Sequence, residues 1–283
     1  MVYVSTSCLK GDKSRFEPDV ITVVNKYINL GIKKMELGAA HRPFNDFSLL
    51  KKLKKQNDLD FIFHGNFPAS NEKRYLNIAS IDEDFRKRCI KIFFDSLEKL
   101  NYLEGNFLSL HPGGIADYLL DDTTTLNLSD IRSATQRAIE SLQLIVDRAK
   151  ENGIKIAIEN LPGTITKDIV NLPSEFMFIK KQADVGLLLD LGHLDTYIIS
   201  ENKKGRGLVR KQLIKEFEPY IYEIHCHKAI MRDEHLMPEK NQFSDLKRKT
   251  LIKARLTLEI NNADEKMVLE GKQLLESLKP VTL

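Results

Sequence analysis

The sequence has few cysteines, no long apolar run and almost no surplus of charge. Its three cysteines, Cys8, Cys89 and Cys226, are widely spaced and form no Cys-x-x-Cys pair. An odd number of cysteines without a secretion signal favours a reducing, cytoplasmic location. No apolar stretch is long enough to span a bilayer, and the first residues lack the basic and apolar regions of a signal peptide. We therefore expect no membrane partner.

The charged residues are nearly balanced, with 43 lysines and arginines against 40 aspartates and glutamates, so the formal net charge is +3. Such a charge neither requires nor excludes an anionic partner such as nucleic acid. A hydrophobic content of 42% is ordinary for a globular protein. No linker, sequence repeat or low-complexity tract interrupts the 283 residues. We therefore expect a single domain over residues 1–283.

Short apolar segments alternate with helical patterns along the whole chain. Eight segments are rich in Val, Ile, Leu and Phe without polar alternation, which indicates strands buried on both faces. They are Val2–Ser5, Lys34–Leu37, Phe61–His64, Phe107–His111, Ile156–Asn160, Val185–Asp190, Ile221–His225 and Leu256–Glu259. Eight strand–helix units in a chain of this length predict an α/β fold, a single (β/α)8 TIM barrel.

Six successive predicted strands end in side chains that can bind a metal. These are His64, His111, Glu159, Asp190, His225 and Glu259. A barrel gathers the carboxyl ends of its strands at one rim. A single residue of this kind is more often a packing or capping residue, but six together would be crowded charges without a counter-ion. A divalent cation supplies that charge, and mixed histidine and carboxylate ligands suit Zn, Mn or Co, with Mg for carboxylate-rich subsets.

Further candidates follow the sixth and seventh predicted strands. His193 comes three residues after Asp190, on the loop leaving the sixth strand. Asp233 and His235 form an Asp-x-His pair, which in an extended segment points both side chains to one side.

The residues directly after the seventh strand are also candidates. By alternation His227 faces the same way as His225, as an alternative ligand or a substrate contact. Lys228 and Arg232 are either contacts for a phosphate or other anionic group or solvated surface charges.

These strand ends and their surroundings resemble the xylose-isomerase-like TIM-barrel superfamily. It includes sugar isomerases and epimerases as well as the endonuclease IV class of DNA-repair enzymes. The resemblance covers the whole chain, and its specificity comes from the segments together. They are Phe63-His64, Tyr75-Leu76-Asn77-Ile78-Ala79-Ser80, His111-Pro112-Gly113, Ile158-Glu159-Asn160, Leu189-Asp190-Leu191-Gly192-His193, Ile224-His225, Asp233-Glu234-His235-Leu236 and Leu258-Glu259.

The resemblance implies one to three divalent metal ions. The superfamily shares one metal site, which here would be formed by Glu159, Asp190, His225 and Glu259. Endonuclease IV binds two further metals. By resemblance one would use His64 and His111 with Glu159, and the other His193, Asp233 and His235.

Several departures favour the sugar phosphate isomerase/epimerase branch over endonuclease IV. Residues 65–74 separate His64 from the Tyr75-Leu76-Asn77 segment, which follows closely in the repair enzymes. Cys226-His227-Lys228 stands where that family has an Asn-Asp pair, and the loop to Asp233 is shorter.

The preferred interpretation is a metal-dependent sugar or sugar-phosphate isomerase or epimerase that works through an enediolate. In the epimerase relatives two metal-bound glutamates face each other across the sugar. By resemblance these are Glu159 and Glu259, one taking a proton and the other returning it, while His193 helps to hold the substrate.

Two alternatives remain open from the sequence. One is a zinc-dependent endonuclease acting on abasic DNA, for which Arg42, Lys73 and Arg74 with Tyr75 are the obvious basic and aromatic rim residues. The other is a catalytically silent barrel that binds a small ligand or a partner protein. Superfamily relatives are often dimers or tetramers, so a homo-oligomer is a further expectation of the resemblance.

Overall fold

The computed structural model describes residues 1–9, 19–41, 43–72, 75–115, 128–162, 168–200 and 205–279. Eight parallel strands pair in sequence order, and β1 pairs with β8 to close the barrel. The predicted (β/α)8 barrel is confirmed, and each predicted strand agrees with the structure to within one residue at either end. The strands are β1 Val2–Ser5, β2 Lys34–Leu37, β3 Asp60–His64, β4 Phe107–Leu110, β5 Lys155–Glu159, β6 Gly186–Asp190, β7 Ile221–Cys226 and β8 Arg255–Leu258.

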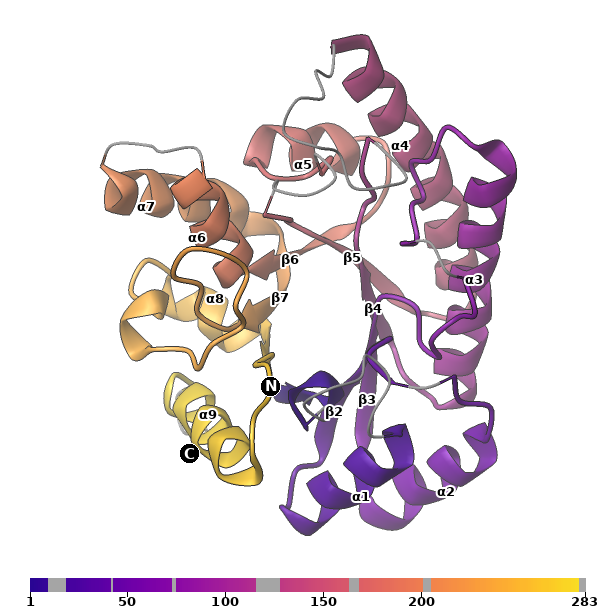
Figure 1. The fold of residues 1–283 in the computed structure, drawn as a ribbon, viewed down its shortest axis with the longest axis vertical. Coiled ribbons are helices and arrows are strands. Elements are labelled where there is room, and N and C mark those ends of the chain that lie inside the picture. Colours follow the sequence, from indigo (N-terminus) through magenta and orange to yellow (C-terminus); the bar gives the residue numbers. More distant parts are fainter. Residues whose placement is uncertain are drawn as a thin grey trace.

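Helices surround the strands (Figure 1). The α-helices are α1 Val20–Asn29, α2 Phe47–Asn57, α3 Glu83–Tyr102, α4 Leu128–Glu151, α5 Pro173–Lys180, α6 Leu191–Ser200, α7 Arg206–Phe217, α8 Arg248–Lys253 and α9 Glu265–Ser277. Short 3-10 helices span Thr6–Leu9, Glu218–Tyr220 and Lys240–Phe243. No helix in the described part of the chain is both long enough and apolar enough to cross a membrane.

The inside of the barrel is apolar at one end and polar at the other. Tyr3, Ile62, Phe107, Ala157 and Leu188 form a small buried cluster, separate from the large core that packs the strands against the helices. Because side chains alternate along a strand, the residue two positions further on faces the same interior. On β3, β5 and β6 that residue is respectively His64, Glu159 and Asp190. The apolar cluster therefore forms the floor of a polar site at the carboxyl ends of the strands.

Candidate metal centre

Three predicted carboxylate ligands, at the ends of β5, β6 and β8, converge on an imidazole nitrogen of a fourth ligand, on β7. His225 Nδ1 lies 2.9 Å from Glu259 Oε2, 3.6 Å from Asp190 Oδ2 and 3.8 Å from Glu159 Oε1. The side chains of His225, Asp190 and Glu159 are buried, and that of Glu259 is 16% exposed. We call Glu159, Asp190, His225 and Glu259 the central donor set. Its three carboxylates all lie within 3.8 Å of His225 Nδ1.

Two buried atoms of the central donor set have charged neighbours in the described part of the chain but no well-oriented hydrogen bond. Among the described residues, His225 Nδ1 and Glu159 Oε2 have no hydrogen-bond partner of acceptable geometry. The other nitrogen of His225, Nε2, lies 3.0 Å from Oε2 of the buried Glu36 on β2. A carboxylate on the far side of an imidazole orients the ring and increases its basicity toward a metal. The open Nδ1 and Oε2 atoms therefore fit ligands of a divalent ion.

A second group of donors surrounds the other oxygen of Glu159. Glu159 Oε2 is 3.0 Å from His111 Nε2 and 3.5 Å from His64 Nε2. The remaining nitrogen of each ring also has a partner. His64 Nδ1 is 3.1 Å from the Ser109 hydroxyl, and His111 Nδ1 contacts the hydroxyl of Tyr75. We call His64, His111 and Glu159 the second donor set.

A third group meets at Asp233. His193 Nε2 and His235 Nε2 lie 3.1 Å and 3.2 Å from Asp233 Oδ2. His193 Nδ1 faces the carbonyl oxygen of Asn160 at 3.0 Å, and His235 Nδ1 faces that of Glu259 at 3.2 Å. A carbonyl oxygen only accepts, so each Nδ1 donates its proton to the carbonyl, and Nε2 can bind a metal when the ring is neutral. We call His193, Asp233 and His235 the third donor set.

His193 lies on a helix, whereas the sequence placed it on a loop. It belongs to the first turn of α6, which begins directly after β6 without intervening turn residues. Asp190 Oδ1 accepts the backbone N–H of His193 at 2.7 Å, as an N-cap residue does. Asp190 therefore caps α6 with one oxygen while the other faces the centre. The spacing of Leu191, Leu194 and Ile198, all buried, was the available signal for this helix.

Asn160 holds the ends of β5 and β6 together, a role that the sequence did not reveal. Its amide nitrogen donates to the carbonyl of Asp190 at 3.0 Å, and its amide oxygen accepts the Asp190 N–H at 2.8 Å. Its own carbonyl accepts His193 Nδ1. A buried amide with these three bonds fixes the backbone of one predicted ligand and the ring of another.

Replacing Asn160 with alanine should destabilise the protein by about 1–3 kcal/mol, because both backbone groups of Asp190 would lose a buried partner. Urea unfolding, followed by circular dichroism, measures this change. Asn101→Ala, at an exposed position of α3, is the matched control and should change stability by less than about 0.5 kcal/mol. Equal stabilities of the two variants would contradict the role assigned to Asn160.

The pKa values of Glu159, His225 and His235 are each shifted toward the charged form of the side chain. Burial by itself raises the pKa of Glu159, but His111 and His193 outweigh it and hold that pKa well below its usual range. Burial opposes protonation of His225, yet Glu36 and Glu259 raise its pKa well above the ordinary value. His235 behaves similarly, since Glu259 and Asp233 outweigh burial and raise its pKa to about 9. Protons on the imidazoles and a bound cation are alternative sources of the charge that the carboxylates require.

One buried carboxyl lies below the donor sets. Burial, followed by the nearby charge of Glu36, raises the pKa of Glu223 to about 8. Its Oε1 accepts the Thr257 hydroxyl at 2.6 Å. Glu36 and Glu223 therefore extend the polar interior beneath His225. In the sequence Glu36 lies beside the end of the second predicted strand, whereas Glu223 lies inside the seventh.

The loop that carries Asp233 and His235 is held by its own backbone. Lys228 and Leu236 exchange two N–H to carbonyl bonds of 2.9 Å, which close the loop at its base. The Glu234 carboxylate accepts the N–H groups of Ile230, Met231 and Arg232 at 2.9, 3.2 and 3.0 Å. His235 has a left-handed backbone, with φ of 50°, so the segment is not extended as expected. The side chains of Asp233 and His235 nevertheless meet.

Lys228 and Arg232, the two predicted anion contacts, have different surroundings. The Lys228 ammonium pairs with Glu239, and this lowers the pKa of the Glu239 carboxyl. The side chain of Arg232 is exposed on the loop after β7. Contact of Lys228 and Arg232 with an anionic substrate stays a prediction. Arg42, Lys73 and Arg74 lie outside the described residues.

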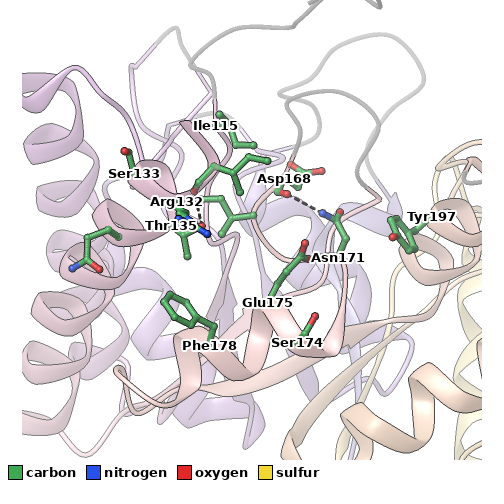
Figure 2. Close-up of a pocket in the computed structure, with 13 residues that line it drawn as sticks. Ile115, Arg132, Ser133, Thr135, Asp168, Asn171, Ser174, Glu175, Phe178 and Tyr197 are labelled. Atoms are coloured by element: carbon green, nitrogen blue, oxygen red, sulfur yellow. Dashed lines mark hydrogen bonds between the residues drawn. The ribbon is translucent and has the colours of Figure 1, made fainter. Parts of the chain in front are cut away.

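A cavity of about 920 Å³ lies apart from the donor sets, among α4, α5 and α6 (Figure 2). Asn171 Nδ2 donates to the carbonyl of Asp168 at 2.8 Å within it. None of the predicted metal ligands lines this cavity, so its volume does not locate the chemistry. Its lining consists of Ile115, Ile131, Arg132, Ser133, Thr135, Gln136, Asp168, Ile169, Asn171, Ser174, Glu175, Phe178 and Tyr197.

The chain belongs to the family described as xylose isomerase-like TIM barrel, whose sequence profile matches residues 26–278. A curated relative is an uncharacterized protein of Methanocaldococcus jannaschii, 26% identical over 151 residues. That match spans 52% of this chain and 46% of the relative, so it covers less than half of the relative's length.

Solved structures with the same fold include several whose names are those of sugar epimerases. A D-tagatose 3-epimerase-like protein is 19% identical, with 98% of this chain and 96% of that chain covered and a TM-score of 0.74. D-psicose 3-epimerase from Clostridium cellulolyticum H10, with D-tagatose, is 19% identical, with 99% of both chains covered and a TM-score of 0.70. The 3-keto-D-glucoside 4-epimerase of E. coli is 14% identical, with 98% of both chains covered and a TM-score of 0.68. At these identities the likeness establishes the shared barrel.

Proposed function

We propose that the protein is a divalent-metal-dependent sugar or sugar-phosphate isomerase or epimerase. The observation that carries this proposal is the convergence of Glu159, Asp190 and Glu259 on His225 Nδ1 at the carboxyl ends of the strands. The sugar epimerases among its structural neighbours share the barrel in which this convergence occurs. Zinc and manganese are the metals proposed, because both accept mixed histidine and carboxylate ligands, and magnesium and cobalt are further candidates.

The central donor set would hold the ion and position the substrate's reacting carbon between two carboxylates. A bound divalent ion supplies a Lewis acid that polarises a carbonyl and stabilises charge on neighbouring oxygens. Glu159 and Glu259 are the proposed acid–base pair, one removing the proton beside the carbonyl and the other returning it. Glu259 is the more accessible of the two, with 16% of its side chain exposed against 1% for Glu159. His193 is a proposed substrate contact as well as a member of the third donor set.

Solvent exchange tests this function with any sugar that the site accepts. The metal-loaded protein is incubated in deuterium oxide with a panel of ketoses, aldoses and sugar phosphates, and incorporation at the carbon beside the carbonyl is followed by NMR. We expect exchange with at least one sugar, and we expect it to stop when the metal is chelated and return when zinc or manganese is restored. Full exchange activity in metal-free protein would refute the proposal.

A second candidate function is a phosphodiesterase acting at abasic sites in DNA. The second and third donor sets favour it, because they provide ligands beyond the central set, and several metals together activate a hydroxide and stabilise a leaving oxygen. Cleavage of an abasic duplex that is lost in His111→Ala, together with no exchange on any sugar, would favour this function. Metal analysis adds a further comparison: one ion per chain favours the sugar enzyme, three favour the phosphodiesterase, and two leave both in place.

A further inference from the structure

His227 lies between the central donor set and the third donor set. It is fully buried, with 0% of its surface exposed. Its Nε2 is 2.9 Å from Asp190 Oδ2 and 3.9 Å from Asp233 Oδ1. Its ring also stacks on that of His235, with centroids 3.8 Å apart and planes 5° from parallel. The sequence left His227 as a ligand or a substrate contact, and the structure directs its Nε2 toward the carboxylates of Asp190 and Asp233.

The stacking also argues against His227 and His235 binding the same ion. An imidazole nitrogen holds a metal at about 2.0–2.1 Å along a lone pair that lies in the plane of the ring. The two rings occupy parallel planes, so an ion in the plane of His235 lies outside the plane of His227. Closeness alone groups His227 with His193, Asp233 and His235, and also with Asp190 and Glu259. Ring orientation argues against an ion shared with His235, and the contact with Asp190 is a hydrogen bond of 2.9 Å. His227 is instead suited to donate Nε2–H to the Asp190 carboxylate, which when ionised can only accept hydrogen bonds.

Gly192 provides the space that the His227 ring occupies. A Cβ atom at Gly192 would lie 2.0 Å from Cε1 and 2.4 Å from Nδ1 of His227. The backbone of Gly192 is within the first turn of α6 and outside the left-handed region, so it would accept alanine. Glycine is therefore needed at position 192 because the His227 ring occupies the space of a Cβ atom, and not because of its backbone conformation.

We propose that His227 is a positioning residue that couples the central and third donor sets. It fixes the Asp190 carboxylate of the central donor set through Nε2 and supports the His235 ring of the third donor set by stacking. Gly192 leaves the space that this placement needs. The inference rests on the proposed metal centre, since it assigns His227 the task of orienting two ligands. Partners of this kind typically change metal affinity by about 10–100-fold when they are removed.

Metal affinity, measured by competition with a chromophoric chelator for zinc, tests the role without any substrate. His227→Ala should weaken zinc binding by about 10–100-fold. Gly192→Ala should do the same, because its Cβ displaces the ring. In the double variant Gly192→Ala/His227→Ala there is no imidazole ring for the new Cβ to displace. The zinc affinity of the double variant should therefore equal that of His227→Ala alone. Such non-additivity is the signature of two residues that act through one contact.

Two further variants separate positioning from a general loss of structure. His227→Gln places an amide N–H where Nε2 stands, so it should restore affinity to within about threefold of the native protein at the site that uses Asp190. Gly207→Ala is the matched control, since Gly207 is also the second residue of a helix and a Cβ there meets nothing within 4 Å. It should leave zinc binding unchanged. Circular dichroism of each metal-free variant checks that the barrel is folded.

Native affinity in His227→Ala or in Gly192→Ala would overturn the proposal. Additive losses in the double variant would also overturn it, since Gly192 would then act independently of His227. A native protein that binds no zinc or manganese would refute the proposed metal centre instead. In that case the coupling of Gly192 with His227 is read from the free energies of unfolding, where the same non-additivity is expected.

Discussion

Glu159→Gln should reduce sugar exchange by about a thousandfold or more while the barrel stays folded. The carboxylate of Glu159 belongs to the central and second donor sets, and it also lies 3.0 Å from His193 Nδ1. The amide keeps the shape of the side chain but removes the charge that binds the ion and the base that moves the proton, effects of about 10²–10⁴-fold for the base alone. Exchange in deuterium oxide measures the loss, and circular dichroism measures folding.

Two comparisons make this result specific. Glu216→Gln, an exposed carboxylate on α7, should retain native activity and metal content. Glu259→Gln should also abolish exchange, but it should retain more metal than Glu159→Gln. Glu259 forms ion pairs with His225 and His235, whereas Glu159 pairs with His64, His111, His193 and His225. Native activity and metal content in Glu159→Gln would exclude it from the site.

Removal of the metal should lower the melting temperature by roughly 10 °C. A ligand that binds only the folded state at about 1,000 times its Kd adds about 4 kcal/mol, and each kcal/mol shifts the melting temperature of a chain approaching this size by about 2–4 °C. The physical source is the buried carboxylates of Glu159, Asp190 and Glu259, whose mutual repulsion a cation relieves. Differential scanning calorimetry with saturating zinc, and then with excess chelator, measures the shift.

The same two scans on Glu216→Gln should show the same difference in melting temperature between zinc and chelator as the native protein. Glu259→Gln should show a smaller difference. Identical melting temperatures with zinc and with chelator would mean that no ion stabilises the native fold. That result would remove the basis for both proposed enzyme functions.

The sequence was most informative where strand period and residue type coincide. A short apolar run that ends in histidine or a carboxylate specifies both a buried strand and the side chain at its end, which is why Glu159, Asp190 and His225 were found and their convergence expected. Closure of the barrel explains the convergence, because it brings the ends of strands that are distant in sequence to one rim.

Residues whose role depends on how connections fold could not be found in this way. The contact of Tyr75 with His111 depends on the course of the segment after β3, which no local pattern specifies. Asn160 was visible as an amide next to a ligand, but its pairing with Asp190 requires the alignment of β5 with β6. Helix α6 was missed because Asp190 ends β6 and also caps the helix, so the boundary contains no separate turn residue.

The loop between Lys228 and Leu236 has a consequence for how this barrel can diversify. Its base is tied by a reciprocal backbone pair and its turn by Glu234, so the spacing of Asp233 and His235 is set inside the loop itself. Insertions beyond Leu236 would lengthen the chain without altering that spacing. The segment therefore sets the backbone positions of Asp233 and His235 by itself. A transplant onto another barrel of this family would also need His227 and the Glu259 carbonyl, which hold the His235 ring from outside the loop.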